Sequence, residues 1–216
     1  MGKNHTKEIV LVAIVGALSF ILMFIGFPII PALPYLKVDF SLVPILLVAF
    51  ISGPKKAVAA SLIANGLHYM YTGGEMGIPI GDATAFIATI AYILPIYYLL
   101  KDQMATVYTL KDQMATVYTG NKSAKEMNFG KTIAAYLAAT LSLTLVMTIL
   151  NYFVITPFYM QVMNFDVGNM QTYILAGIIP FNLFKGVLVS LLAHFVLVQT
   201  LPTLVNRFGT REYSHH

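Results

Sequence analysis

The sequence predicts an all-α integral membrane protein: a bundle of six transmembrane helices with both termini in the cytoplasm. Of its 216 residues, 58% are hydrophobic and only 10% are charged. A soluble domain has about 25% charged residues, so these few charges cannot cover a surface exposed to water. The chain also has no cysteine, which excludes disulfides, thiolate metal sites and cysteine nucleophiles.

Six apolar stretches predict the helices, because a helix needs about 20 apolar residues to cross the hydrocarbon core. The second stretch is short and spans only if Leu36 and Val38 contribute, and the third follows a tight turn at Gly53 and Pro54. The sixth begins at Pro180, a residue that suits the first turn of a helix. In order, the predicted spans are residues 9–30, 40–52, 57–71, 83–100, 132–154 and 180–201.

The basic residues orient the bundle. With cytoplasmic termini, most of the 13 lysines and arginines lie on the inner side, the outer loops hold only Lys37, and Lys185 lies within a span. The reverse topology would contradict the positive-inside rule. The first stretch is longer than a signal-peptide core of about 7–15 residues, so we interpret it as an uncleaved helix. The inner basic residues are Lys3, Lys7, Lys55, Lys56, Lys101, Lys111, Lys122, Lys125, Lys131, Arg207 and Arg211.

The whole chain, residues 1–216, is predicted to be one transmembrane substrate-binding domain. Its fourth and fifth helices are joined by a cytoplasmic connection at residues 101–131, where KDQMATVYT occurs twice without change, at 101–109 and 111–119. Insertions are tolerated best in such a segment, so the duplication predicts no function. The terminal Ser214, His215 and His216 are interpreted as a tag remnant.

The sequence contains no pattern that predicts catalysis, a metal site or a bound cofactor. It has no serine–histidine arrangement, no paired carboxylates and no HExxH. Residues 130–132 (GKT) imitate the end of a phosphate-binding loop, but Lys125 stands where its first glycine belongs. All nine acids fall in loops or at span ends, so none is placed to couple transport to protons or sodium. His194 is expected to be packed. Such a protein needs a partner to do work.

Lys185 is the residue that most strongly predicts a binding site. A charge at the bilayer centre costs about 2.5–3.5 kcal/mol, so a lysine inside a span indicates function unless it snorkels outward. Asn182 lies three residues earlier and therefore shares its helix face. With Phe181 and Phe184 beside them, these side chains predict a polar group next to an aromatic wall.

Further polar candidates converge on the outer side. Each has a structural explanation by itself, since a histidine is more often packed than ligating. Together they predict a pocket with apolar walls and a few polar groups, open to the outside and capped by the proline-rich first loop. They are Lys37 and Asp39 in that loop, His68 at the end of the third helix, Thr84 at the start of the fourth and Asn151 near the outer end of the fifth.

Small residues on the first helix are candidates for a partner surface. Ala13, Gly16 and Ala17 are spaced at three and four residues, which allows another helix to approach closely. Spacing alone leaves two alternatives open: packing against the chain's own helices, or docking of a partner subunit.

Three segments resemble the substrate-binding S-components of energy-coupling factor (ECF) vitamin transporters, most closely the riboflavin-specific RibU type. Residues 36–41 (LKVDFS), followed by Pro44, are similar to the family pattern L-K-x-D-x-S-x-x-P. The Gly53–Pro54 turn and the alanine-rich helix that ends in His68 resemble the family's third helix. Residues 180–185 (PFNLFK) are similar to the P-F-N-x-x-K of riboflavin binders. Residues 81–85 (GDATA) depart from the Gly-Glu-x-x-Asn common in those proteins.

This resemblance implies a monomeric six-helix bundle in a bacterial cytoplasmic membrane, with riboflavin bound near the outer face. Asn182 and Lys185 would bind the flavin's polar groups, with Asn151 a weaker match. Ala13 and Ala17 would dock a transmembrane coupling subunit, and two cytoplasmic ATPases would supply the energy. The alternatives are an S-component for another vitamin or a nucleobase-like ligand and, more remotely, a small membrane enzyme acting on lipids or a structural scaffold.

Overall fold

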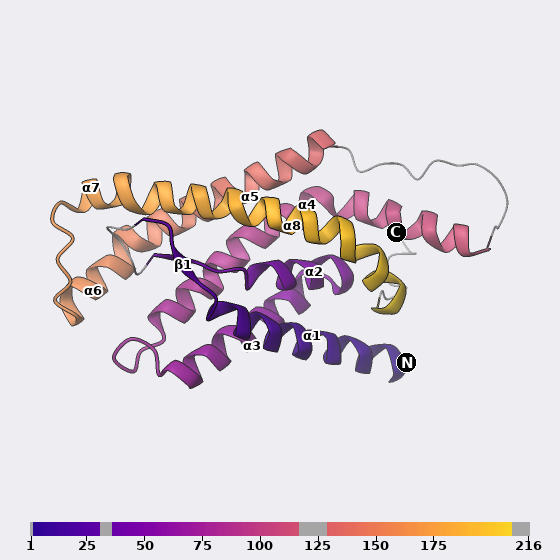
Figure 1. The fold of residues 1–216 in the computed structure, drawn as a ribbon, viewed down its shortest axis with the longest axis horizontal. Coiled ribbons are helices and arrows are strands. Elements are labelled where there is room, and N and C mark those ends of the chain that lie inside the picture. Colours follow the sequence, from indigo (N-terminus) through magenta and orange to yellow (C-terminus); the bar gives the residue numbers. More distant parts are fainter. Residues whose placement is uncertain (1, 31–35, 117–128, 209–216) are drawn as a thin grey trace.

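The computed structural model describes residues 2–30, 36–116 and 129–208, and within them the fold is a helical bundle with one short β-ribbon (Figure 1). The elements are α1 (Gly2–Met23), β1 (Phe27–Pro28), β2 (Lys37–Val38), α2 (Leu42–Ser52), α3 (Pro54–Thr72), α4 (Ile80–Thr116), α5 (Phe129–Leu150), η1 (Asn151–Ile155), α6 (Thr156–Val162), α7 (Met170–Tyr173), η2 (Ile174–Ile178) and α8 (Ile179–Phe208). The elements η1 and η2 are π-helical turns.

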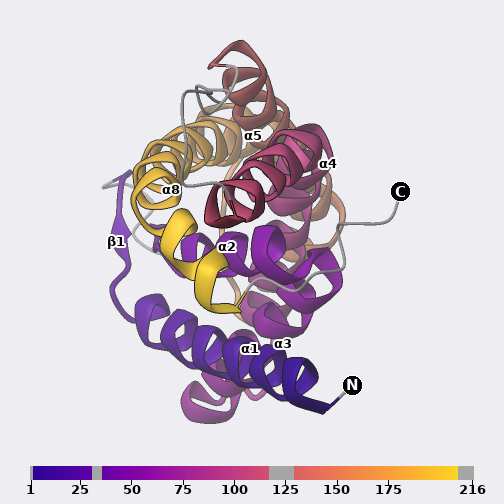
Figure 2. The same cartoon turned by 90° about the vertical axis from the view of Figure 1, so that its right-hand side faces the viewer.

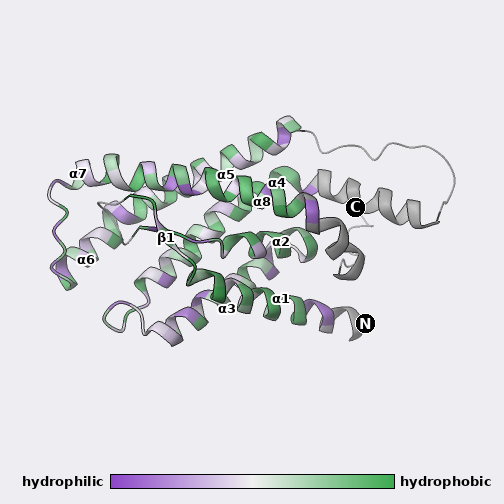
Figure 3. Cartoon of the chain, in the orientation of Figure 1, coloured by the Kyte–Doolittle hydropathy of each residue, from purple (hydrophilic) through white to green (hydrophobic). Residues whose placement is uncertain are grey.

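Four helical stretches are long and apolar enough to cross a membrane: Thr6–Met23, Ile80–Lys101, Phe129–Val162 and Met170–Leu197. Helix α2 is apolar but shorter. Figure 3 shows hydrophobic residues along the middle of the helices and hydrophilic residues mainly toward their ends. All six stretches predicted from the sequence contain a helix, and the chain is a multi-pass membrane protein.

The connections lie at two opposite ends of the bundle (Figure 1). One end, which we call the ribbon end, holds β1 and β2, the α3–α4 connection and α6 with α7. The other end, the basic end, holds the start of α1, the far ends of α4 and α8, and the start of α5. Both terminal helices therefore begin or finish at the basic end.

Helix α2 forms the centre of the core. Figure 2 shows it enclosed by the longer helices, and it contacts α1, α3, α4 and α8. Ile45, Leu46 and Phe50 are almost completely buried. A helix that is hydrophobic all round has to be buried, and this explains why so short a segment is stable here.

The first predicted span was wrong at its outer end. Helix α1 stops at Met23, and the next residues form β1, in which Phe27 pairs with Val38 and Pro28 with Lys37 of β2. Gly26 and Pro28 explain the early stop, because glycine weakens a helix and proline removes a backbone donor. The second helix likewise begins at Leu42, after the ribbon. Pro31 and Pro34 lie outside the described residues.

Helix α4 continues beyond the predicted fourth span, through the first part of the predicted connection, to Thr116, although its apolar stretch ends at Lys101. No glycine or proline occurs between Lys101 and Thr116 to stop it. The end of the second nonapeptide falls within residues 117–128, outside the described residues, as does the tag-like segment at 214–216.

The last two helices are longer than predicted, because each passes through a proline. The fifth continues to Val162 through Pro157, and the sixth begins at Met170, so that Pro180 does not start it. A proline ring clashes with the carbonyl four residues earlier, which here belongs to Phe153 and Ala176. Both carbonyls lie inside the π-turns η1 and η2, whose wider spacing accommodates the rings.

A third proline is accommodated by a different device. Pro95 lies inside α4, and the carbonyl four residues before it is that of Ala91. The Ser142 hydroxyl on α5 donates a 2.8 Å hydrogen bond to this oxygen. A side chain from a neighbouring helix thus satisfies the backbone group that a proline frees, as expected where no water is available.

Candidate functional site

An ion pair joins α8 to the segment after β2 at the ribbon end. Lys185 Nζ lies 3.7 Å from Asp39 Oδ2, and the two side chains are 17% and 21% exposed. The Asp39 carboxylate also accepts a 2.9 Å hydrogen bond from the Ser41 backbone N–H and another from the Ser41 hydroxyl. Asp39 therefore holds the start of α2 and the ammonium group of α8 at the same place.

Two buried asparagines lie beside the π-turns, Asn151 at the start of η1 and Asn182 on α8. Asn182 is 3% exposed and Asn151 is 6% exposed. Each donates a side-chain N–H, at 2.8 Å, to the carbonyl four residues earlier, that of Ile178 for Asn182 and that of Met147 for Asn151. Each amide is thereby held against its own helix.

The π-turns are placed at these same asparagines. η1 begins at Asn151, and η2 ends at Ile178, whose carbonyl accepts from Asn182. The two turns contact each other. Single π-turns inside α-helices occur frequently at functional sites, so their pairing here supports the asparagines as part of a site.

His68 and Asp82 form a second polar contact at the ribbon end. His68 Nδ1 lies 2.6 Å from Asp82 Oδ1, which ties the end of α3 to the start of α4. The ring centroid of Phe24, after α1, is 5.1 Å from that of His68. His68 therefore organises three segments in this structure, whereas the sequence predicted a substrate contact.

Glu75 organises the α3–α4 connection from within. Its carboxylate accepts a 3.1 Å hydrogen bond from the Gly81 backbone N–H, and it interacts with the side chain of Tyr159 on α6. The Tyr69 hydroxyl donates to the Gly77 carbonyl at 2.9 Å. Sequence reasoning missed Tyr159, because the predicted fifth helix ended before it. Pro157 indicates a helix end in the sequence, so no sequence signal placed Tyr159 on this helix.

The structure does not gather the remaining predicted residues into one cluster. Phe181 is buried and Phe184 is 51% exposed, so the two rings of the predicted wall differ in their surroundings. The Thr84 hydroxyl donates to the Ile80 carbonyl of its own helix at 2.6 Å. Lys37 is exposed on β2.

The small residues of α1 lie on two different faces. Ala13 and Ala17 are exposed, and Gly16 is buried. A Cβ atom at Gly16 would lie 2.8 Å from Ile63 Cγ2 and 3.2 Å from the Ala60 carbonyl, both on α3. Gly16 therefore packs against the chain's own helix α3, and of these three residues Ala13 and Ala17 remain available to a partner.

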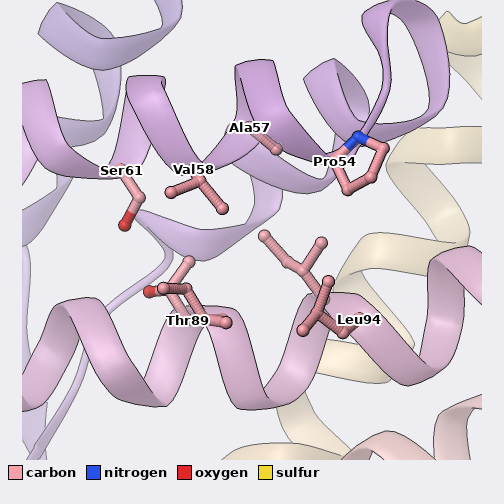
Figure 4. Close-up of a pocket in the computed structure, with 8 residues that line it drawn as sticks. Pro54, Ala57, Val58, Ser61, Thr89 and Leu94 are labelled. Atoms are coloured by element: carbon pink, nitrogen blue, oxygen red, sulfur yellow. The ribbon is translucent and has the colours of Figure 1, made fainter.

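A small apolar pocket between α3 and α4 is not a ligand site. It holds about 10 Å³, the space of about one water, and Pro54, Val58 and Leu94 are among its lining residues (Figure 4). Among the residues that the structure describes, no three histidine, aspartate or glutamate side chains gather to hold a metal ion.

Comparison with known proteins assigns the family. Residues 7–197 match the family model described as the substrate-specific component of ECF transporters. The chain belongs to this family. As an ECF S-component it is the substrate-binding part of a transporter and not an enzyme, which excludes the alternative of a lipid-modifying enzyme.

Named relatives and a solved structure cover nearly the whole S-component. The riboflavin transporter RibU of Staphylococcus aureus is 32% identical, over 96% of either chain. The riboflavin transporter FmnP of Bacillus subtilis is 31% identical, over 91% of this chain and 93% of its own. The solved structure, titled "Structure and mechanism of the S component of a bacterial ECF transporter", has a TM-score of 0.66 at 30% identity and covers 93% of this chain and 98% of its own.

Proposed function

We propose that this S-component captures riboflavin at the outer face of the membrane and delivers it inward with an ATP-driven partner module. The observation that carries the proposal is the meeting of two sequence motifs at the ribbon end, where Lys185 of PFNLFK contacts Asp39 of LKVDFS. Relatives that are named riboflavin transporters and match almost the full chain support the choice of ligand.

The chemistry of the site suits this vitamin. Riboflavin has a flat, largely apolar ring with polar edges, and a ribityl chain rich in hydroxyl groups. An asparagine amide both donates and accepts hydrogen bonds, and an ammonium group donates three. Asn151, Asn182 and Lys185 can therefore satisfy the polar atoms of the flavin, while apolar residues such as Phe181 cover the ring. The segment that carries Asp39 closes over the ligand.

The proposed topology has six membrane helices, α2 and α3 included, with both termini in the cytoplasm. The exposed Lys55 and Lys131 lie in the first turns of α3 and α5, and the exposed Lys101 ends the apolar stretch of α4. The starts of α3 and α5 and the far end of α4 are on the side of the basic end (Figure 1). The positive-inside rule makes this end cytoplasmic and the ribbon end external.

The energy comes from partners in this proposal. A transmembrane coupling subunit docks against the exposed Ala13 and Ala17 of α1, where small side chains let a helix approach closely. Two cytoplasmic ATPases drive the coupling subunit, which reorients the loaded bundle until the site faces inward. The S-component itself remains a monomer.

A flavin titration tests the proposal. The purified protein should carry flavin absorbance, or should quench riboflavin fluorescence saturably at one site per chain. Lys185→Ala should weaken binding about tenfold or more, since it removes about 1.5–3 kcal/mol of charged hydrogen bonding. Asn182→Ala should weaken it about two- to tenfold, since a neutral hydrogen bond contributes about 0.5–1.5 kcal/mol. Leu183→Ala, between them on an exposed position, is the matched control. Wild-type protein without quenching would leave another vitamin or a nucleobase-like compound as the ligand.

A further inference from the structure

A groove between α5 and α8 is used by neither the proposed ligand site nor the proposed partner surface. Its volume is about 320 Å³, at the lower limit of the range of about 300–1,000 Å³ for small-ligand pockets. The lining residues repeat at three and four positions, so one face of each helix forms each wall. They are Phe129, Thr132, Ile133, Tyr136, Leu137 and Thr140 on α5, and Val187, Ser190, Leu191 and His194 on α8.

The walls and the floor of the groove differ in character. Leu137, Val187 and Leu191 form exposed apolar rims, at least half exposed to the surroundings. The floor contains the ring of His194, which meets that of Tyr136 edge to face at 6.0 Å. Both helices are membrane spans, so the rims face lipid and the groove opens toward hydrocarbon.

A contact between α5 and α8 closes the groove at the end that lies farther from the basic end. A Cβ atom on Gly186 would lie 2.6 Å from Thr140 Cγ2, so α5 and α8 touch at this level. Figure 1 shows the two helices crossing and then diverging toward the basic end. The groove therefore runs along α5 from Phe129, at the basic end, to Thr140.

The length of the groove matches one leaflet of a bilayer. Eleven residues separate Phe129 from Thr140, which is about 16 Å at 1.5 Å per residue. The hydrocarbon core is about 30 Å thick, so one leaflet occupies about 15 Å. Lys131 is exposed at the mouth, next to the lining residue Thr132. An ammonium group at that depth is complementary to a lipid phosphate.

We infer that the groove binds one acyl chain of an anionic phospholipid from the leaflet at the basic end, with the headgroup phosphate near Lys131. This leaflet is the inner one if the proposed topology holds. An ordinary annular lipid covers a convex helix surface. The acyl chain in the groove would instead lie between α5 and α8, and its end would meet the close contact at Gly186. The bound lipid would fill the space that α5 and α8 leave open.

Photo-cross-linking tests the site without removing any residue. The protein is reconstituted in phosphatidylcholine vesicles that contain a phosphatidylglycerol probe with a diazirine on one acyl chain. After illumination, mass spectrometry should find the probe on peptides from both 129–140 and 187–194. Probe cross-links spread evenly over all exposed helix faces would overturn the inference. So would a groove that is covered by a second copy of the protein and yields no lipid cross-links.

Filled and uncharged variants sharpen the test. Leu137→Trp together with Leu191→Trp should lower groove cross-linking about fivefold or more, which corresponds to ~1 kcal/mol of binding. Leu145→Trp, equally exposed on α5 but outside the groove, should leave it unchanged. Lys131→Gln should reduce the preference for phosphatidylglycerol over phosphatidylcholine. Equal cross-linking in the filled and control variants would refute the site. The flavin titration is independent, so failure of the two proposals can be told apart.

Discussion

Lys185 and Asp39 form an ion pair, 3.7 Å between Nζ and Oδ2, that connects two of the segments whose sequences resemble ECF S-components, LKVDFS and PFNLFK. In the sequence these segments lie far apart and predict separate contributions to a site. In the structure each residue fixes the other. The connection between α1 and α2 is thereby tied to the helix that carries the predicted ligand contacts, so that in the proposed function a ligand held by Lys185 would act directly on the segment that contains Asp39.

A double-mutant cycle tests this coupling. Asp39→Asn and Lys185→Met should each weaken riboflavin binding, because each leaves its partner without a counter-charge. The double variant should lose less than the sum of the two, by about 0.5–3 kcal/mol, as expected for residues in contact. Affinities from flavin-quenching titrations give the coupling energy directly. Strictly additive losses would show that Asp39 and Lys185 are not coupled in ligand binding, and would contradict the prediction.

The His68–Asp82 contact should contribute to stability. Asp82→Asn should lower the free energy of unfolding by about 1.5 kcal/mol, the low end for a hydrogen bond to a charged group, since the His68 side chain is 24% exposed. Thermal unfolding in detergent measures the effect. Asp166→Asn is the matched control: Asp166 accepts from the Gly168 N–H in an exposed turn that asparagine also supports. Equal melting temperatures for the two variants would contradict the prediction.

Gly186 should not accept a larger side chain. Gly186→Ala would bring a Cβ atom within 2.6–2.9 Å of three Thr140 atoms, an overpacking that costs about 1–3 kcal/mol. Gly66→Ala, in α3 with no heavy atom within 4 Å, should be neutral or stabilising by up to about 1 kcal/mol. Thr140→Ala should restore part of the loss caused by Gly186→Ala. Melting temperatures in detergent measure these effects. Equal changes for Gly186→Ala and Gly66→Ala would contradict the close contact between Gly186 and Thr140.

The alanine face of α1 should matter for transport and not for binding. Ala13→Trp combined with Ala17→Trp blocks the approach of a partner helix, so uptake of labelled riboflavin by cells that also express the coupling module should fall about tenfold or more, equivalent to ~1.4 kcal/mol of docking energy. Flavin quenching by the isolated S-component should be unchanged. Leu145→Trp on α5 is the control for adding an indole to the lipid-facing surface. Normal uptake by the alanine-face variant would place the partner elsewhere.

Apolar stretches were sufficient to locate the helices, because a membrane span satisfies its backbone groups within the helix and needs about 20 mostly apolar residues. The helix ends were harder to predict. Pro157 and Pro180 indicate helix boundaries in the sequence, yet both lie inside continuous helices because a π-turn precedes each. No pattern of hydrophobicity distinguishes a π-turn from an α-turn, so these two extensions could not be foreseen.

The candidate site was predictable to the extent that its residues lie on predicted spans. Asn182 and Lys185 share a helix face as their spacing indicates, and Asn151 is buried on the neighbouring helix. The pairing of His68 with Asp82 depends on the path of the α3–α4 connection, which sequence spacing does not give. Tyr159 was not predicted, because the predicted fifth helix ended at residue 154, before it. The sequence identified ligand-type residues better than the polar contacts that position them.

The two π-turns also have a consequence for the length of the chain. A turn of this kind holds one residue more than an α-turn, and one residue rotates all that follows by about 100° around the helix axis. Deleting one residue within Ile174–Ile178 would turn α7 about its axis while Asp39 and Thr140 keep α8 in place. The direction of Asn182 is thus independent of a change of one residue in α7 or η2, and η1 gives Asn151 the same independence from α6.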